Sequence, residues 1–481
     1  MLYLMRLLQS TLIFVSLFLC ISCEKIDTST QEEIKQLIRT HSIPLYFQKD
    51  SITNFLLANR IALDSLLRDK HIIGLGESTH GTHESTVLNC EIIKYLVQFK
   101  NCKAICMESY YLPSVVANDY ILGRISHDDP SIVQAGTVKS AQPFKQLLEW
   151  LRQYNKSALR KVQIYGICFG GYSSLAPIVL NFIQRYDSSY YSAIANNYKQ
   201  LYDFALAPVS TKNITLTYAQ DWSEETPLDS IRQWTTTTQR VYSHLCLNKN
   251  TYYQKADTFT ANAAIRAAKM IAQDFARPDV RDKEQDNLWT GLARKVGFSA
   301  YSRNKNIGLV YKYKDSCWAA NTKEIAKELS ADEKLVVWAH NAHIGRIISF
   351  NETKRLGYYL DVEYGNQYIP IGHIFYEGMF LALNEHGYSK QFHTQTPPNN
   401  SIEDIFYSAL PTNPSFAVAF NTTRATQIVR HSPKLYIRAI GGIFTPTAQE
   451  FVEERPLNQF DALIYLRKTT PQKTFTMKFA P

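Results

Sequence analysis

The chain has 481 residues, of which 45% are hydrophobic and 20% are charged, proportions typical of a globular protein with a large core. This composition excludes a disordered chain, and the length indicates one large domain with an insertion, or two domains. The formal net charge is +9, but the basic residues are scattered and no nucleic-acid-binding motif is present. We therefore expect no nucleic-acid partner.

The N-terminus has the pattern of an export signal. Arg6 supplies a positive charge, residues 7–21 are almost continuously apolar, and Cys23 follows a small residue. This pattern predicts a lipoprotein-type signal peptide over residues 1–23, although Cys20 replaces the leucine of the usual lipoprotein box. We expect Cys23 to be lipidated, so that the exported chain is anchored to the cell envelope, at the outer membrane or the periplasmic face. A plain cleaved signal and an uncleaved anchor are the alternatives.

The main part of the chain alternates between apolar and amphipathic segments. Residues 24–50 form a polar tether with one short helix, expected around residues 31–39. The helices expected next lie at residues 84–99 and 143–154. The predicted strands lie at residues 72–75, 103–107, 162–165, 334–338, 367–375, 415–420 and 461–466. This β-α-β-α-β order predicts an α/β fold with a mostly parallel central sheet flanked by helices.

A polar, tyrosine-rich segment interrupts this alternation. Residues 186–300 have helical spacing, clearest over residues 227–247 and 260–275, and contain no clear buried strand. We expect them to form a helical insertion or lid on a core made of residues 51–185 and 301–475. A plain helical subdomain is the equal alternative.

Polar residues and glycines follow four of the predicted strands. Ligands of open α/β sheets bind at the carboxyl ends of the strands, so these residues are expected to converge at one edge. They are Glu77 and His80 after the first strand, Glu108 after the second, Gly166 to Gly171 after the third, and His340 and His343 after the fourth.

Glu77 and His80 form the core of the predicted site. They are three residues apart on a turn or helix start, so they can share a face. A carboxylate beside an imidazole fixes its tautomer and raises its basicity, and such a histidine can deprotonate water. Gly74, Gly76 and Gly81 suit a sharp turn from strand to helix. The structural alternative is that Glu77 caps backbone donors and His80 fills the turn.

Two other chemistries fit these strand ends. Glu77, His80, His340 and His343 supply enough ligands for Zn²⁺ in a metal-dependent hydrolase, although no HExxH helix is present. Cys168, in the sequence GICFGG, has the position of the nucleophile in a strand-to-helix elbow. No persuasive acid for its triad is evident, so a buried structural thiol is the simpler interpretation.

Six segments, in order along residues 50–475, resemble the erythromycin esterase family. They are GLGESTHGTHE (74–84), AICMES (104–109), VVWAHNAHIG (336–345), YGNQYIPIGHIFYEGMF (364–380), IGGIFTPT (440–447) and FDALIYLRKTT (460–470). The resemblance implies an α/β hydrolase that needs no cofactor and acts on a small-molecule ester. Its named substrate class is the macrolactone ring, whose opening gives macrolide resistance; glycan-linked or polyketide esters are substitutes.

The resemblance also implies roles for individual residues. His80 would be the base that activates water, with Glu77 as its partner and Glu108 as a further acidic residue. One of His340 and His343 would stabilise the oxyanion or complete the proton network. Binding contributions are expected from three more residues, with the first supporting rather than catalytic: Glu84, Ser78 and Arg303.

The chain departs from the family pattern at three places. Asn89 or Cys90 stands where the family usually has an Arg or Lys, and Cys168 stands where it often has Gly-x-Asp. The family's Arg-Asp element ahead of Met-Ala-x-Asn is degraded, with only Arg303, Asn304 and Asn306 near it. These losses are expected to weaken charge stabilisation in the site. They also motivate a further alternative, a non-catalytic ligand-binding surface lipoprotein on the same fold.

Overall fold

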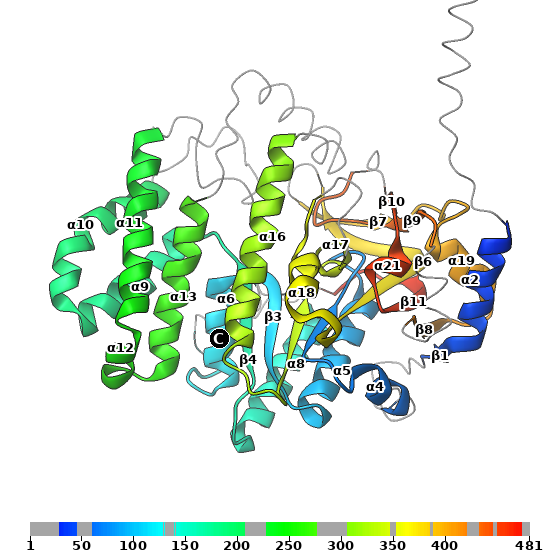
Figure 1. Ribbon diagram of the computed structural model, residues 1–481, viewed down its shortest axis with the longest axis horizontal. Helices are drawn as coiled ribbons and strands as arrows, with labels where there is room; N and C mark the ends of the chain where they lie inside the picture. Colours follow the sequence, from blue (N-terminus) through cyan, green and yellow to red (C-terminus); the bar gives the residue numbers. More distant parts are fainter. Residues whose placement is uncertain are drawn as a thin grey trace, which may run out of the picture.

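In the part of the chain that the structure describes, the protein is an α/β structure built on a nine-stranded sheet (Figure 1). The computed structural model describes residues 28–45, 60–127, 129, 139, 141–206, 228–276, 305–346, 353–384, 388–420, 432–445 and 450–473. The strands run in the order β1-β8-β11-β6-β2-β5-β3-β4, with β7 paired to β6. From β11 to β4 every neighbouring pair is parallel, whereas β8 and β1 are antiparallel additions. The predicted fold class is confirmed.

The strands of the large sheet are β1 (Ser42–Pro44), β2 (Ile72–Leu75), β3 (Cys102–Tyr110), β4 (Gln163–Cys168), β5 (Lys334–Trp338), β6 (Tyr368–Leu383), β7 (Ser389–His393), β8 (Ser415–Ala419) and β11 (Ala462–Thr469). A separate antiparallel pair is formed by β9 (Leu435–Arg438) and β10 (Phe451–Glu454). The central strands β2 and β5 are buried almost throughout, because a parallel sheet covered on both faces needs apolar residues on both.

Helices cover both faces of the sheet, and each face has its own apolar core. One core joins the sheet to α5 (His83–Phe99), α6 (Tyr111–Ile121) and α8 (Gln142–Ser157). The other joins it to α2 (Thr28–His41), α16 (Lys305–Ala326), α18 (Leu356–Tyr364) and α19 (Ile402–Ala409). The shorter helices are α4 (Arg60–Leu67), α17 (Asn341–Ile344), α21 (Pro456–Gln459) and the 3₁₀ turn η1 (Gly365–Gln367).

Five further helices form a group beside the β4 end of the sheet (Figure 1). They are α9 (Tyr172–Tyr186), α10 (Ser188–Leu206), α11 (Leu228–Leu247), α12 (Lys249–Lys255) and α13 (Thr258–Phe275). They pack around a core of their own, which includes Tyr198, Val241 and Ile271. Helices α11 and α13 lie where the sequence predicts helices. The division of the chain at residues 186 and 300, and the role of a lid, stay predictions.

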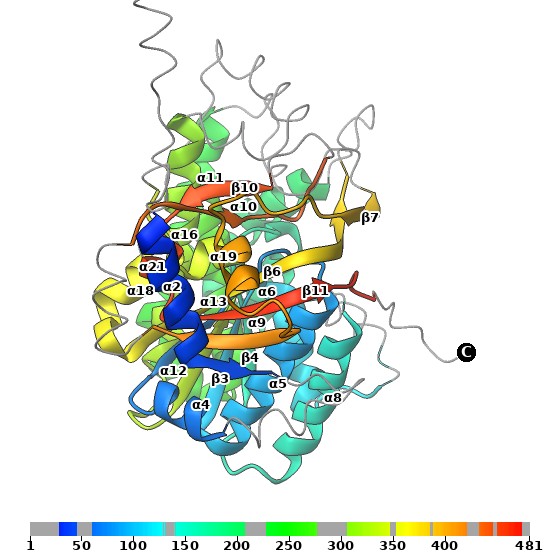
Figure 2. The same ribbon diagram turned by 90° about the vertical axis from the view of Figure 1, so that its right-hand side faces the viewer.

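The predicted signal peptide, including Cys23, lies outside the described residues. Across the part of the chain that the structure describes, no helix combines the length and apolar character needed to cross a membrane. Figure 2 shows α2 lying along the outer side of the sheet near β1 and β8. The predicted short helix of the tether is therefore packed against the core, because Ile34, Leu37 and Ile38 on one side of α2 are buried there.

Candidate active site

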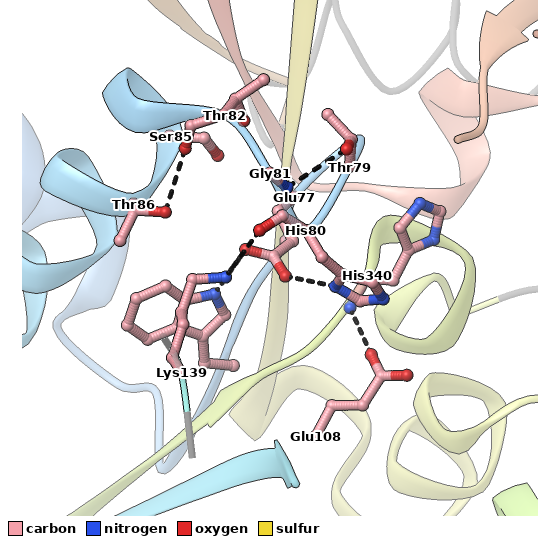
Figure 3. Close-up of polar contacts among 12 residues, drawn as sticks. Glu77, Thr79, His80, Gly81, Thr82, Ser85, Thr86, Glu108, Lys139 and His340 are labelled. Atoms are coloured by element: carbon pink, nitrogen blue, oxygen red, sulfur yellow. Dashed lines mark hydrogen bonds and ion pairs between the residues drawn. The ribbon is translucent and has the colours of Figure 1, made fainter. Parts of the chain in front are cut away.

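The carboxyl ends of neighbouring strands bring the predicted residues together. Strand β2 lies beside β5, and β5 lies beside β3, all parallel. Glu77 and His80 follow β2, Glu108 lies near the end of β3, and His340 and His343 follow β5. Figure 3 shows side chains from these three elements pointing toward one another. The convergence expected from the strand ends is therefore present in the structure.

The turn between β2 and α5 is held by backbone contacts on both sides. The Asn341 N–H donates to the Glu77 carbonyl oxygen at 2.9 Å, and the Gly81 N–H donates to Thr79 Oγ1 at 3.2 Å. The Leu381 N–H of β6 donates to the Gly81 carbonyl at 3.1 Å. A Cβ atom at Gly81 would lie 1.8 Å from the Leu381 carbonyl oxygen, so only glycine allows this approach.

The residues that follow β11 form hydrogen bonds with the start of α5. Both carboxylate oxygens of Glu84 accept hydrogen bonds from Thr470, from its N–H at 2.8 Å and its hydroxyl at 2.6 Å. The His83 N–H donates to the Thr470 carbonyl at 2.9 Å, and the Gln472 N–H donates to the Gly81 carbonyl at 2.8 Å. Glu84 thus fastens the start of α5 to Thr470, and its supporting role in a site stays a prediction.

Glu77 is buried and accepts three hydrogen bonds. His80 Nδ1 lies 2.7 Å from Oε1, while Lys139 Nζ and Trp338 Nε1 lie 2.7 Å and 3.0 Å from Oε2. Burial opposes ionisation, but the charge of Lys139 and the bond to His80 outweigh it, so the pKa of Glu77 is held well below its ordinary range. Glu77 is therefore an anion that orients the imidazole of His80.

His80 is the partly exposed residue of the Glu77–His80 pair, with 37% of its side chain exposed. Because Nδ1 is bonded to Glu77, Nε2 is the nitrogen left for water or substrate. Burial of the ring lowers the pKa of His80, but the bond to Glu77 and the negative charge of Glu108 outweigh it and raise that pKa. The arrangement is that of a strengthened base.

His340 has both ring nitrogens occupied within the protein. Its Nε2–H donates to the carbonyl oxygens of Ser78 and Ile440, each at 3.1 Å, and its Nδ1 accepts the Ala342 N–H at 3.2 Å. Burial and the nearby charge of His80 lower the pKa of His340 to about 4. Its ring lies edge-on to His80, with centroids 5.6 Å apart. His340 is thus a neutral side chain whose ring packs against His80 and helps to position it.

Glu108 and His343 belong to a second acid–histidine group. His343 Nε2 lies 3.4 Å from Glu108 Oε1, and His343 Nδ1 lies 2.7 Å from Asp315 Oδ1. Asp315 also accepts from Arg355 and from a backbone N–H. Burial opposes the ionisation of Glu108, but the neighbouring imidazoles of His343 and His80 outweigh it and lower its pKa. Of the two histidines after β5, His343 has the contacts of a proton network.

Asp315 corrects one expectation about the family pattern. The sequence places the remnant of the Arg-Asp element near Arg303, which lies outside the described residues. An element with the same spacing lies on α16, with Lys314 and Asp315 ahead of Trp318-Ala319 and Asn321. Lys314 and Trp318 replace the arginine and methionine of this element, but its aspartate is kept, and the buried Asp315 is bonded to His343. The aspartate was missed because its arginine and methionine neighbours are replaced.

Lys139 is the second functional residue that sequence reasoning missed. At the departure on α5, Asn89 Nδ2 donates to the Gly76 carbonyl at 3.0 Å and brings no charge. The expected shortage of positive charge does not arise at Glu77, because Lys139 supplies an ammonium group from another part of the chain. No local pattern around Lys139 marks it, so only the folded arrangement reveals the contact.

The side chain of Ser78, which is expected to bind substrate, is hydrogen-bonded to other parts of the protein. It is buried, its hydroxyl donates to the His373 carbonyl, and its oxygen accepts from Asn341 Nδ2 at 3.3 Å. These bonds join the turn after β2 to β6 and to the residues that follow β5. Arg303, which is also expected to contribute to binding, lies outside the described residues. The hydrogen bonds of Ser78 thus give it a structural role, and its part in binding stays a prediction.

The two alternative chemistries fit the geometry less well. Both nitrogens of His340 and of His343 are engaged by protein groups, so neither presents a lone pair to a metal shared with His80. Within the described ranges no group of three or more His, Cys, Asp or Glu side chains could hold a metal ion. Burial and the charge of Glu108 raise the pKa of the Cys168 thiol well above its ordinary value, which disfavours a thiolate nucleophile.

His373 on β6 gives a prediction about pH and stability. Burial lowers its pKa to about 4, and its Nδ1 lies 2.7 Å from Ser85 Oγ. Since the unfolded imidazole has the ordinary pKa near 6.5, the folded state loses stability as the pH falls from 6.5 toward 4, by about 2 kcal/mol at pH 5. The His373→Gln variant should therefore lose about 2 kcal/mol less than wild type between pH 7.5 and 5 in urea unfolding.

The control for that measurement is His393→Gln, on the exposed side of β7. It should show the same decrease in unfolding free energy as wild type over this pH interval. Equal decreases for wild type and His373→Gln would contradict the assignment of a buried neutral imidazole at His373.

Comparisons with known proteins show the family and the fold of the chain. The model of the erythromycin esterase family matches residues 97–469. A protein from Bacillus cereus has a similar structure, with a TM-score of 0.73, 20% identity, and coverage of 92% of this chain and 99% of that one. A succinoglycan biosynthesis protein is similar at a TM-score of 0.70 and 20% identity, covering 94% and 100%. An erythromycin esterase mutant in its open conformation is similar at 0.60 and 15%, covering 88% and 96%.

Proposed function

We propose that this chain, which belongs to the erythromycin esterase family, is a hydrolase in which His80 deprotonates water for attack on an ester or lactone carbonyl. The observation that carries the proposal is the 2.7 Å bond between His80 Nδ1 and the buried Glu77, which leaves Nε2 for water. Family and fold support hydrolase activity in general, and this pair supports the specific mechanism.

The steps follow from the positions of the charges. His80 Nε2 takes a proton from water as the water oxygen bonds to the carbonyl carbon, and the π electron pair of the carbonyl moves onto its oxygen to give a tetrahedral oxyanion, which re-forms the carbonyl when the leaving oxygen departs. Glu77 and Glu108 stabilise the imidazolium that forms, since both lower its energy through their negative charge. When the carbon–alkoxide bond breaks, the imidazolium returns the proton to the leaving oxygen. His340 stays neutral and keeps the ring of His80 in place.

The substrate class proposed is a small-molecule ester. Macrolactones come first, since a structurally similar protein is an erythromycin esterase, and acylated glycans come second, since another is a succinoglycan biosynthesis protein. We further propose that the chain is exported and held at the membrane through a lipid on Cys23, as its N-terminal sequence indicates. It is proposed to have no nucleic-acid partner.

A panel of esters tests the mechanism. Erythromycin, aryl acetates, simple lactones and acylated glucose would be incubated with the full chain in ¹⁸O-labelled water. We expect hydrolysis of at least one of them, with one ¹⁸O in the acid product, and no loss of rate with a chelator. Cys168→Ser should keep the wild-type rate, because the thiol is protonated and takes no part.

Three outcomes would each contradict the proposal. Loss of activity with a chelator and recovery with Zn²⁺ would favour the metal-dependent hydrolase. Loss of activity in Cys168→Ser, with an acyl group trapped on wild type, would favour a cysteine nucleophile. Thermal stabilisation by a panel compound that is never hydrolysed would favour a binding protein.

A further inference from the structure

We propose that Lys139 is a positioning residue of the catalytic pair, Glu77 and His80. Its positive charge balances the negative charge of Glu77, so that His80 need not be protonated and its imidazole can act as a base. The inference rests on the proposed function of His80 and extends it to a residue far along the chain. Figure 3 shows Lys139 on the side of Glu77 away from His340.

Lys139 is held by several groups of the catalytic turn, the segment of residues 76–82 between β2 and α5. Its Nζ lies 2.7 Å from Glu77 Oε2 and 3.5 Å from the His80 carbonyl oxygen. It also lies 4.9 Å from the centre of the Trp338 ring, a cation–π distance. Only 9% of its side chain is exposed. Because its ammonium group is committed to Glu77, His80 and Trp338, it acts through Glu77 and does not touch the reacting atoms.

The charge balance explains what Lys139 does. The side chain of Glu77 is 4% exposed, and a buried carboxylate needs a positive partner close by. Of the described groups bonded to it, Lys139 and a protonated His80 can carry that charge. If Lys139 were neutral, the proton on His80 would be the remaining counter-charge at Glu77. Nε2 would then be protonated at rest and unable to take a proton from water.

The other titratable groups that the structure describes around the pair do not replace Lys139. Burial keeps His340 after β5 and His373 on β6 neutral, since it lowers the pKa of each to about 4. Burial raises the pKa of the Cys90 thiol on α5, so that group is neutral as well. Glu108 on β3 is negative and favours a proton on His80. The ammonium of Lys139 is therefore the positive charge at the pair that acts against both carboxylates and disfavours a proton on His80.

The test follows the protonation of His80 directly. The full chain would be labelled with ¹³C at the histidine Cε1 positions, and the His80 signal would be identified by its absence in His80→Asn. We expect the pKa of His80 to rise by at least about one unit in Lys139→Met, as removal of an adjacent charge typically produces. Lys139→Arg, which keeps the charge, should shift it by less than half as much.

Two further variants separate charge from hydrogen bonding and from general effects. Lys139→Gln keeps an N–H donor for Glu77 but loses the charge, so it should behave like Lys139→Met. Lys145→Met removes a half-exposed lysine of α8 that pairs with Glu149, and it should leave the titration of His80 unchanged. In ester hydrolysis, the acid limb of kcat/KM should move to higher pH in the Met and Gln variants, with activity recovering at high pH.

Several results would overturn the inference. One is an unshifted His80 titration in folded Lys139→Met and Lys139→Gln; another is a wild-type titration in Lys139→Gln alone, which would assign the effect to a hydrogen bond. If both neutral variants fail to fold while Lys139→Arg folds, the lysine serves stability and the positioning role is wrong. The titration needs no substrate, so an inactive wild type would sink the proposed function while the effect of Lys139 is still measured.

Discussion

Replacing His80 with asparagine should lower kcat/KM for ester hydrolysis by about 10² to 10⁴-fold, the range that general-base catalysis contributes. Asparagine retains a polar side chain next to Glu77 but has no basic nitrogen to take the proton of water. Because the His80 side chain is 37% exposed and its backbone is held by the turn, the thermal midpoint should change little. Stopped or continuous assays with a hydrolysed ester, together with thermal melts, measure both effects.

The matched variants sharpen that result. His393→Asn, on the exposed side of β7, should keep the wild-type rate. Glu77→Gln should reduce the rate as well, because the glutamine amide cannot stabilise the imidazolium that forms on His80. Full activity of His80→Asn would show that the base lies elsewhere, and the mechanism proposed here would be wrong.

Replacing Gly81 with alanine should have the largest effect on stability. The new Cβ would lie 1.8 Å from the Leu381 carbonyl oxygen and 2.6 Å from its carbonyl carbon, both backbone atoms of β6. The two backbones cannot separate easily, since Leu381 and Gln472 both donate to the Gly81 carbonyl. Forced overpacking typically costs about 1–3 kcal/mol, and we expect about 3 kcal/mol or more here because no side chain can yield.

Gly442→Ala is the control for that prediction. A Cβ at Gly442 would meet only His80 Cδ2, at an ordinary contact distance of 3.6 Å, so the unfolding free energy should stay close to wild type. Urea unfolding of Gly81→Ala, Gly442→Ala and wild type makes the comparison. A Gly81→Ala protein as stable as wild type would mean that β6 and the catalytic turn are not packed as described.

The central strands could be predicted because their physical signal is local. Strands β2 and β5 are short apolar runs, buried on both faces, and the predicted bounds of both agree with the structure. Strands β1, β7, β9 and β10 were not predicted. Strand β7 is almost entirely exposed, so its sequence SKQFH lacks the apolar alternation of a half-buried strand, and only its partner β6 defines it. Such strands depend on tertiary pairing that local sequence does not encode.

In the candidate site, too, the residues at strand ends could be predicted from the sequence and the others could not. Glu77, His80 and Glu108 follow strands whose ends the sequence marks, so their convergence follows from topology. Lys139 and Asp315 are distant in the sequence from the groups they bind, by 62 and 28 residues, and neither lies at a strand end. Their contacts depend on how loops and helices cross the sheet edge, which no periodicity reports.

The fastening of the catalytic turn by residues 470–472 has a consequence for the timing of synthesis. Glu84 and its partner Thr470 are 386 positions apart, so the early half of the active site is made long before the segment that secures it. A ribosome-bound chain would hold Glu77 and His80 with the turn unsecured until residues 470–472 have been made. Hydrolytic competence should therefore arise only after these residues have left the ribosome, with shorter nascent fragments inert toward esters.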